Sequence, residues 1–323
     1  MPRQPPPPYF VLRGHKGLVS ALHFTIELYH QGFQQPALIS GSDVGEIFIW
    51  DLKSNRTSHR LNGHENKTIM SLHCYKYSLI SQGRDGVINI WNNIQDQWTV
   101  IRRIHSTSTS VGFCASSLIS VENSVHLMLP NEDKNSLKIH DISGSQVRSI
   151  KFRTEFGMCM CIKAFNMNDK TLLLAGFENG CIGMWDYETE KELCHIKCHK
   201  ELVTCLDFDS NYSNMGISGS VDTSLQVWSL SEKLELIEVK TIEVVNKGIN
   251  AVKIRDDRKI VITAGLDCKV RVFSWKTLQP LAVLQFHELS VHSLACCPVS
   301  VGDHRSVFAS GSKDQNIALW EIY

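Results

Sequence analysis

The chain has 323 residues, and its 33 lysine and arginine residues are matched by 33 aspartate and glutamate residues. This neutral balance argues against a dedicated nucleic-acid binder, which needs a clustered basic surplus to contact phosphates. Hydrophobic residues make up 43% and charged residues 20% of the chain, so we expect a packed globular fold rather than a disordered chain.

The N-terminal sequence and the cysteines predict the cellular compartment of the protein. No apolar run approaches the roughly 20 residues that cross a bilayer, and Met1–Pro8 lacks the apolar centre of a secretory signal. We therefore expect a soluble intracellular protein with no membrane partner, whose 11 cysteines are reduced and mostly buried. Residues 1–8 form a proline-rich tail. Its Pro5–Pro8 tract can dock on an aromatic groove as a polyproline helix, although such tracts are more often flexible tails.

From Tyr9 onward the chain is a series of short β-rich runs behind Gly/Asp turns, with almost no helical periodicity. The ends of these runs recur at intervals of 41, 49, 45, 43, 45 and 47 residues, at Trp50, Trp91, His140, Trp185, Trp228, Phe273 and Trp320. A period of about 45 with Gly-His near the start and Trp-Asp at the end is typical of WD repeats, each of which forms one four-stranded propeller blade. The sequence therefore predicts an all-β, seven-bladed WD40 β-propeller, as a single domain over residues 9–323.

Resemblance to the WD-repeat family implies that one His, Ser, Asp and Trp of a blade form a buried hydrogen-bonded tetrad. Such a network has to be complete, because a buried His or Asp without a partner destabilises the fold. Three blades carry all four residues, namely His64, Ser81, Asp85 and Trp91; His199, Ser218, Asp222 and Trp228; and His287, Ser310, Asp314 and Trp320.

The other blades depart from this pattern. Blade three, around residues 110–141, is the hardest to trace. The remaining departures are Val44 in the Asp position of blade one beside His15, Ser40 and Trp50, Ala175 and Asn179 in blade four, and Asp267 and Phe273 without a histidine in blade six.

The two chain ends predict how the ring of blades closes. Ile317–Trp320 has the pattern of the third strand of its blade, with almost no sequence after it for a fourth. Tyr9–Leu12 precedes the first Gly-His, where no earlier blade exists. We expect this N-terminal strand to pair with the last blade, which closes the ring and removes an exposed sheet edge.

No motif for catalysis or metal binding stands out. Cys194-His195 and Cys198-His199 resemble zinc ligands, but His199 belongs to a tetrad and the spacing lacks the paired ligands of a structural zinc site. No Gly-rich phosphate loop joins a strand to a helix. The Ser, His and Asp set recurs three times at one register, as a structural network does and a unique active site does not. We therefore predict no enzyme activity, no catalytic residue, no metal and no cofactor.

A partner-binding face is predicted on the narrow top of the propeller, at the starts of the inner strands and in the turns before the tetrad aspartates. Apolar side chains rimmed by charges would gather there, as in a protein-binding site. A slip of one residue in the alignment would turn some of these side chains inward. The candidates are Leu18, Met70, Arg84, Met158, Met160, Glu178, Leu202, His292 and Lys313.

Segments outside the repeat signature resemble one family, the guanine nucleotide-binding protein subunit beta-like protein 1, whose fungal relatives are called ASTRA-associated protein 1. They are residues 10–14, 79–85, 111–114, 206–210, 271–275, 279–284 and 311–315. The resemblance implies a non-enzymatic scaffold or adaptor in the cytoplasm and nucleus. Its implied partners are the cochaperone complex that stabilises and matures phosphatidylinositol 3-kinase-related kinases, and those kinases themselves, in DNA-damage signalling.

Alternative functions use the same fold. A substrate receptor of a cullin-type ubiquitin ligase would carry Trp-Asp-x-Arg at a blade end, whereas the blades end in runs such as Trp50–Lys53 and Trp228–Ser231. A generic chromatin-complex scaffold also stays open. A G-protein β subunit resembles this propeller but holds its γ chain by a long N-terminal coiled coil, and four consecutive prolines cannot sit in such a helix. We expect no γ subunit bound by a coiled coil.

Overall fold

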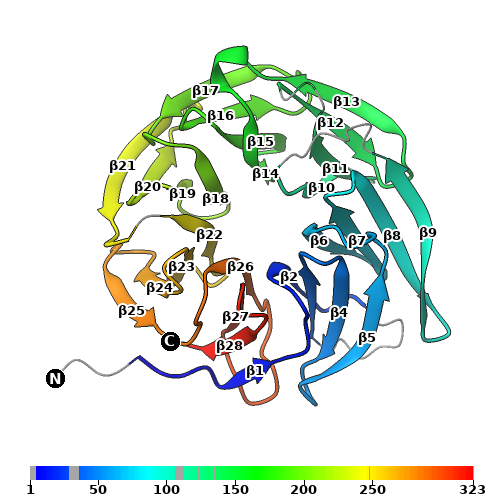
Figure 1. The fold of residues 1–323 in the computed structure, drawn as a ribbon. Helices are drawn as coiled ribbons and strands as arrows, with labels where there is room; N and C mark the ends of the chain where they lie inside the picture. The colour runs from blue at the N-terminus through cyan, green and yellow to red at the C-terminus, as the bar shows by residue number, and fades with distance from the viewer. Residues whose placement is uncertain are drawn as a thin grey trace. The chain divides into compact units, whose positions relative to one another are not determined.

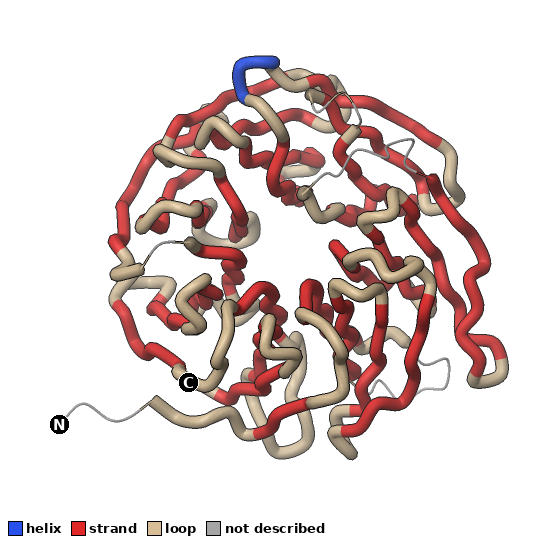
Figure 2. Tube along the Cα trace, viewed as in Figure 1, coloured by secondary structure: helices blue, strands red, loops and turns tan. Residues whose placement is uncertain are grey.

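The computed structural model describes residues 5–28, 36–105, 113–121, 124–131, 133, 135–246 and 248–322. The chain divides into two compact units, residues 1–105 with 255–323 and residues 106–254, and each is described by itself. Strands dominate both units, and the one helical segment in the described ranges is the 3-10 turn Thr154–Phe156 (Figure 2). None of the described residues lies in a helix with the length and apolar character to cross a membrane.

The strands form seven four-stranded sheets, which are the blades of a seven-bladed β-propeller, as predicted (Figure 1). The sheet orders are β2-β3-β4-β5, β6-β7-β8-β9, β10-β11-β12-β13, β14-β15-β16-β17, β18-β19-β20-β21, β22-β23-β24-β25 and β26-β27-β28-β1. We number these sheets blade one to blade seven in that order. In each blade the first strand in this order is the inner strand and the fourth is the outer strand.

The first unit contains β1 to β9 and β23 to β28. Their bounds are β1 Phe10–Leu12, β2 Val19–Thr25, β3 Ala37–Ser42, β4 Glu46–Asp51, β5 Arg56–Asn62, β6 Ile69–Tyr75, β7 Ser78–Gly83, β8 Val87–Ile94, β9 Gln97–His105, β23 Ile260–Gly265, β24 Val270–Ser274, β25 Pro280–Leu284, β26 Val291–Cys296, β27 Val307–Ser312 and β28 Ile317–Glu321.

The second unit contains β10 to β22. Their bounds are β10 Ser117–Val121, β11 Ser124–Pro130, β12 Ser136–Asp141, β13 Gln146–Lys151, β14 Cys159–Met167, β15 Lys170–Phe177, β16 Cys181–Asp186, β17 Glu192–Lys197, β18 Val203–Asp209, β19 Met215–Ser220, β20 Ser224–Leu230, β21 Leu236–Glu243 and β22 Ile249–Ile254.

The repeat column found in the sequence lies on the third strand of every blade. Trp91 is on β8, Trp185 on β16, Trp228 on β20 and Trp320 on β28, and all four indole rings are buried. Blade three, the hardest to trace in the sequence, forms all four of its strands, with His140 on β12. The period of about 45 residues therefore marks one structural position, because each blade repeats the same burial of its third strand.

The N-terminal strand completes the last blade, as predicted. β1 runs antiparallel to β28, with Phe10 opposite Leu319 and Leu12 opposite Ile317 (Figure 1). The backbone N–H of Tyr9 donates to the carbonyl of Leu319 at 2.9 Å. Leu12 is 1% exposed and packs in the same apolar cluster as Leu319. Hydrophobic burial and ladder hydrogen bonds together attach the first strand to the last.

Neighbouring blades of one unit pack where a small residue faces a β-branched one. A Cβ added to Gly41 of β3 would lie 2.5 Å from the side chain of Ile69, the first residue of β6. In the second unit, a Cβ on Gly219 would lie 2.7 Å from Ile249, which begins β22. The middle glycine of these Ser-Gly-Ser runs is therefore required by the close approach of the next inner strand.

A buried arginine holds the C-terminal end of the first unit. Arg255 is 2% exposed and donates to both carboxylate oxygens of Asp257 at 2.9 and 2.8 Å. Its Nη1 also donates to the carbonyl of Ile322 at 2.6 Å. The guanidinium thus links residue 255, where the second segment of the first unit begins, to Ile322, which follows β28. Asp257 pairs its charge.

Candidate functional site

Blades two and seven each join all four residues of the predicted tetrad. In blade two, Trp91 Nε1 donates to Ser81 Oγ at 2.9 Å, and Ser81 Oγ lies 2.8 Å from His64 Nε2. His64 Nδ1 lies 3.1 Å from Asp85 Oδ2. In these chains the indole donates to the serine, the serine hydroxyl donates to Nε2, and Nδ1–H donates to the carboxylate.

Blade seven repeats this geometry, with shorter Trp–Ser and His–Asp contacts. Trp320 Nε1 and His287 Nε2 both lie 2.8 Å from Ser310 Oγ, and His287 Nδ1 lies 2.9 Å from Asp314 Oδ2. Burial raises the pKa of Asp314, but the hydrogen bonds from His287 and the backbone N–H of Asn316 outweigh it and hold that pKa below its usual value. The carboxylate is therefore ionised and fully engaged inside the blade.

Blade five carries the same four residues with a looser carboxylate. His199 Nε2 lies 2.8 Å from Ser218 Oγ, and Trp228 Nε1 donates to the same oxygen at 3.3 Å. His199 Nδ1 is 3.7 Å from Asp222, whose carboxylate instead accepts from both the backbone and the hydroxyl of Ser224 at 2.8 Å. Burial lowers the pKa of His199, so the ring stays neutral at pH 7.

Blade one keeps three members of the tetrad and lacks the fourth. Trp50 Nε1 donates to Ser40 Oγ at 2.7 Å, and His15 Nε2 lies 2.6 Å from the same oxygen. His15 Nδ1 has no hydrogen-bond partner within the described chain, and Glu46 Oε2 is 3.8 Å away. Burial, assisted by Arg60, lowers the pKa of His15 to about 4.

Blades four and six replace the tetrad with different chemistry. In blade six, Arg271 of β24 forms a bidentate ion pair with Asp267 at 3.0 and 2.6 Å, in the blade where the sequence has no histidine. In blade four, Phe152 lies 4.8 Å from Trp185 and 5.0 Å from Phe177 between ring centroids. Neither substitute follows the His, Ser, Asp and Trp signature, so the sequence did not predict them. The one visible signal was the charged Arg271 between apolar residues of β24.

The cysteine and histidine residues near β17 do not converge. His195 Nδ1 bonds to Glu192 at 2.8 Å, while His199 is held by its tetrad. Burial raises the pKa of Cys194 to about 11 and of Cys198 to about 12, so both are thiols at pH 7. No group of three or more His, Cys, Asp or Glu residues that could hold a metal ion occurs among the residues the structure describes.

A buried carboxylate links three inner strands of the second unit. Asp207 of β18 is 4% exposed, and its Oδ1 accepts from Lys163 Nζ of β14 at 2.7 Å. Its Oδ2 accepts from the backbone N–H of Ile254 at 2.9 Å. Burial raises the pKa of Asp207, but Lys163 and Lys253 outweigh it and hold that pKa below its usual value. This charge is satisfied internally, which is the behaviour of a structural group.

The predicted partner-binding residues lie on what we call the top face, formed by the loops into the inner strands and the turns between second and third strands. In the first unit, the backbone N–H of Lys313 donates to the carbonyl of Ser290 at 2.9 Å, and that of Arg84 donates to Thr68 at 2.8 Å. The backbone N–H of Asp43 likewise donates to the carbonyl of Leu18 at 2.9 Å. In the second unit, the backbone N–H of Glu178 donates to the carbonyl of Met158 at 2.9 Å. One repeated bond therefore fixes these turn residues beside the inner-strand entries.

Met70, Met160 and His292 occupy a second repeated position. Each is the extra residue of a β-bulge just after the first residue of its inner strand, since pairing skips from Ile69 to Ser71, from Cys159 to Cys161 and from Val291 to Ser293. His292 Nε2 bonds to Ser290 Oγ at 2.8 Å. Bulges re-aim a side chain, here at the entry of the strand.

The apolar candidates on the top face are only partly exposed. Leu18, Met70, Met158, Met160 and Leu202 are all half-buried, as are Arg84 and His292, and only Glu178 and Lys313 are exposed. These five side chains are therefore only partly accessible to a partner, and their role in partner binding stays a prediction.

Two other leucines of the first unit are exposed on the top face. Leu266, in the turn after β23, is 45% exposed, and Leu289, in the loop before β26, is 46% exposed. Cys268 Sγ donates to the carbonyl of Glu288 at 3.5 Å, and Ser312 Oγ donates to the carbonyl of Leu289 at 3.0 Å. Leu266 precedes Asp267 as Lys313 precedes Asp314, so the repeat register could have found it.

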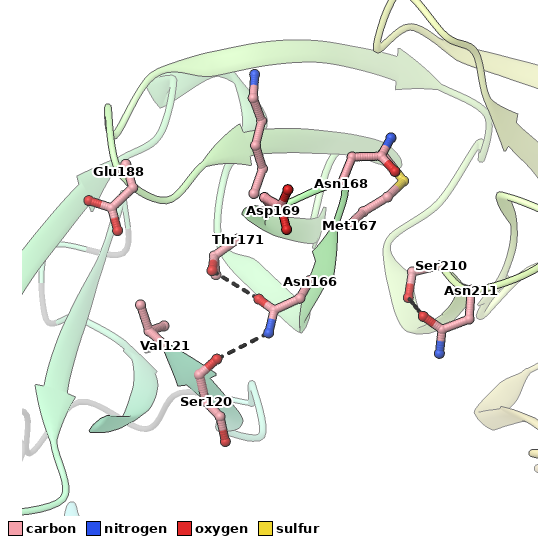
Figure 3. A pocket seen from close by; sticks show the side chains of 11 residues that line it. Ser120, Val121, Asn166, Met167, Asn168, Asp169, Thr171, Glu188, Ser210 and Asn211 are labelled. Atoms are coloured by element: carbon pink, nitrogen blue, oxygen red, sulfur yellow. Dashed lines mark hydrogen bonds between the residues drawn. The ribbon is translucent and has the colours of Figure 1, made fainter. Parts of the chain in front are cut away.

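A polar cavity of about 620 Å³ lies at the opposite ends of the strands in the second unit (Figure 3). Asn166 bridges it, because its amide donates to the carbonyl of Ser120 at 3.1 Å and accepts from Thr171 Oγ1 at 2.9 Å. Ser210 Oγ donates to the side chain of Asn211. Glu188, also in the lining, pairs with Arg148, and most of the lining is polar, whereas small-molecule sites are mostly apolar with a few polar groups.

Comparison with known proteins places this geometry in a family. The model of the "WD domain, G-beta repeat" family matches residues 55–92, 190–229, 238–274 and 278–321. The mouse guanine nucleotide-binding protein subunit beta-like protein 1 is 38% identical over 327 residues, which cover 99% of this chain and 97% of the mouse protein. The chain belongs to the guanine nucleotide-binding protein subunit beta-like protein 1 family.

Fungal proteins named ASTRA-associated protein 1 are similar to this family member along its full length. The protein of Schizosaccharomyces pombe is 24% identical over 380 residues, covering 98% of this chain and 99% of its own. The protein of Aspergillus niger is 26% identical over 444 residues, covering 99% of this chain and 98% of its own. The WD40 propeller and this family place the chain among scaffold-type proteins.

The repeat model matches blades two, five, six and seven of this beta-like protein 1 family member, and each match ends one residue after the aligned Trp or Phe. Three of these four blades carry a full His, Ser, Asp and Trp set. The unmatched blades one, three and four are the ones in which Val44, His140 or Ala175 departs from the signature. The fold therefore persists where the signature residues are lost.

Proposed function

We propose that this chain is a non-enzymatic adaptor that works with the cochaperone complex that stabilises and matures phosphatidylinositol 3-kinase-related kinases, and with those kinases. The observation that carries the proposal is the full-length likeness to beta-like protein 1 and to proteins named ASTRA-associated protein 1. The family resemblance links that name to kinase maturation in DNA-damage signalling. We propose the cytoplasm and the nucleus as the compartments in which it acts.

The internal chemistry of the blades supports an adaptor rather than a catalyst. The three Ser hydroxyls that could act as nucleophiles, Ser81, Ser218 and Ser310, each bond to both a histidine and a tryptophan and are 0% exposed. A nucleophile needs access to substrate and a free position for the reacting carbonyl. These groups are committed to the blade, so recognition falls to the surface.

The partner surface that we propose in the first unit is the leucine surface, defined as Leu266, Leu289, Glu288 and Lys313. It combines two apolar side chains that are nearly half exposed with one acidic and one basic neighbour. Exposed apolar groups ringed by charge favour protein binding, because burying them releases water while the charges set orientation. The carbonyls of Glu288 and Leu289 accept from Cys268 Sγ and Ser312 Oγ, and the backbone N–H of Lys313 donates to Ser290. These bonds hold the backbone of the surface in place before binding, which limits the entropy lost on binding.

The test is affinity purification of the tagged chain from cells, followed by quantitative mass spectrometry. We expect the cochaperone subunits and the kinases to co-purify with the wild-type chain. The paired variant Leu266→Glu with Leu289→Glu should reduce their recovery at least about tenfold, since two charges would be desolvated in the interface.

The matched control is Ile237→Glu with Val239→Glu on the outer strand β21, where both side chains are 49% exposed. This variant should keep normal recovery, and both variants should melt like the wild type. Recovery of cullin-ligase components in place of the cochaperone would contradict the proposed function. Full recovery by the leucine variant would contradict the proposed surface alone.

A further inference from the structure

A run of prolines leads into β1 without joining its sheet. Pro5, Pro6 and Pro7 are exposed, Pro8 is half-buried, and strand pairing begins only at Phe10. A proline has no N–H to give to a β-ladder and has its φ angle fixed near −65°. The tract is therefore outside the blade by its own chemistry, and it runs outward from β1 (Figure 1).

The residue after the prolines is fastened to the blade. The ring of Tyr9 stacks on His304 with 4.1 Å between the centroids and 22° between the planes. The Tyr9 backbone N–H donates to Leu319, and the hydroxyl is buried without a hydrogen-bond partner in the described chain. Tyr9 is thus part of the last blade, and it anchors the C-terminal end of the proline run to that blade.

Four consecutive prolines favour the polyproline II conformation, which has three residues per turn and a rise of about 3.1 Å per residue. The tract spans roughly 10 Å, and Pro5 and Pro8, three residues apart, point the same way. Its carbonyl groups have no internal donors, so they are free to accept from a partner. Because the conformation is already formed, binding costs little ordering entropy.

We propose that Pro5–Pro8 is a second interaction site, which docks as a polyproline helix into a protein module whose groove is lined by aromatic side chains. The partner recognises the proline rings and carbonyls. Tyr9 takes no part, because its ring is committed to His304 and freeing it would peel β1 from β28. The residues that follow, Phe10, Val11 and Leu12, are uncharged, whereas Arg3 precedes the tract in the sequence. A groove that has an acidic residue beside its aromatic side chains therefore also fits this segment. This site is separate from the leucine surface.

The experiment titrates the full chain against three purified modules of this kind: profilin, a Src homology domain that binds proline-rich peptides, and a WW domain. We expect at least one module to bind by calorimetry. The double variant Pro6→Ala with Pro7→Ala should weaken that binding at least about tenfold. Its melting temperature should not change, since both side chains are exposed.

The matched control is Tyr9→Phe, which keeps the ring on His304 and removes only a hydroxyl that has no partner. Binding should be the same as for the wild type. The proposal is overturned if none of the three modules binds, if the double alanine variant binds as well as the wild type, or if Tyr9→Phe abolishes binding. The last outcome would show that a partner takes Tyr9 from the fold.

Discussion

Blades one and two of the first unit hold the same Trp, Ser and His in the same arrangement but surround them differently. In blade two, His64 is paired with Asp85, and Asn89, which faces Ser81 across the sheet, donates to the carbonyl of Gly63 at 2.8 Å. In blade one the corresponding positions are Val44 and Phe48, and Phe48 stacks on His15 at 4.2 Å. One blade has a polar setting for its histidine and the other an apolar one.

The difference teaches that, between these two blades, the acceptor of the histidine and the residue facing the serine change together, whereas blade seven keeps its aspartate with Ala318 facing Ser310. In blade one, Val44 stands in the position of Asp85 and Phe48 in the position of Asn89, and the ring of Phe48 covers His15. A neutral imidazole can be covered by an apolar ring at modest cost, whereas an ionised carboxylate needs donors around it. Blade one is therefore a complete apolar solution rather than a damaged copy of blade two.

The largest loss of stability should come from deleting strand β1, rather than from replacing any residue of a tetrad. Deleting residues 1–12 takes β1 and the buried Leu12 away and exposes the edge of β28 in a blade whose tetrad is complete. We expect a loss of more than about 4 kcal/mol in the free energy of unfolding, from lost burial and ladder bonds. Thermal melting of the truncated chain measures it. An unchanged melt would show that β1 does not complete the last blade.

Placing the residue of blade one into blade two should destabilise the protein. Asp85→Val leaves His64 Nδ1 buried without an acceptor beside Asn89, so we expect a loss of about 3 kcal/mol. Asp85→Asn, which keeps an acceptor, is the control and should lose clearly less. Denaturant unfolding compares the two. Equal losses would mean that shape, not hydrogen bonding, is what blade two requires.

Acid should destabilise blade one before blade two. The pKa of His15 is about 4 in the fold against about 6.5 unfolded, so the unfolded chain binds the proton first and stability falls as pH drops from 6.5 towards 4. At pH 5 we expect this histidine to contribute a loss of about 2 kcal/mol relative to pH 7. Asp85, whose pKa is held low by its hydrogen bonds to His64 and Val87 against the opposing effect of burial, loses its contribution only below pH 4.

The measurement is unfolding at pH 7 and pH 5 for the wild type and for His15→Gln, which cannot titrate. The wild type should lose more stability between the two pH values than the variant does. If both fall by the same amount, the acid sensitivity comes from other groups, such as His199 and His292, whose pKa values are also lowered by burial.

The smallest change in stability should come from adding to blade one the carboxylate that its tetrad lacks. Val44→Asp offers an acceptor to His15 Nδ1, which has none in the described chain, and should stabilise the protein by about 1 kcal/mol at pH 7. It should also raise the pKa of His15 and weaken the acid sensitivity described above. Val44→Asn separates the hydrogen bond from the charge. Destabilisation by Val44→Asp would show that the apolar set of Val44 and Phe48 excludes a carboxylate.

Much of the fold could be predicted because the same sequence pattern recurs in several blades. The spacing of Trp50, Trp91, Trp228 and Trp320 marks the third strands, and the pattern of Tyr9–Leu12 marks a strand without a blade of its own. The tetrads in blades two and seven follow from the same register. The substitutes in blades four and six could not be predicted, because neither follows the His, Ser, Asp and Trp signature. Arg271 pairs with Asp267 four residues earlier, and Phe152, just after β13, packs on Trp185 of β16.

The candidate surface was harder to predict than the fold. The register placed Leu18, Met158 and Lys313 correctly at the entries and turns of the top face, but it does not state how far each side chain leaves the blade. A bulge at Met70 and Met160 shifts pairing by one residue, which a period-2 pattern cannot show. Leu266 and Leu289 were therefore overlooked while more buried residues were selected.

The sequence by itself determined the number of blades, the strand that completes the last one and the family, because these depend on which residues recur and at what interval. Tertiary structure alone decided which histidine has an acceptor, which turn carries an exposed leucine and which buried charges are paired. Those properties depend on distances of a few ångströms between residues far apart in the chain, such as His15 and Ser40 or Lys163 and Asp207. Hydrogen bonds and desolvation change steeply over such distances, and a repeat period does not specify them.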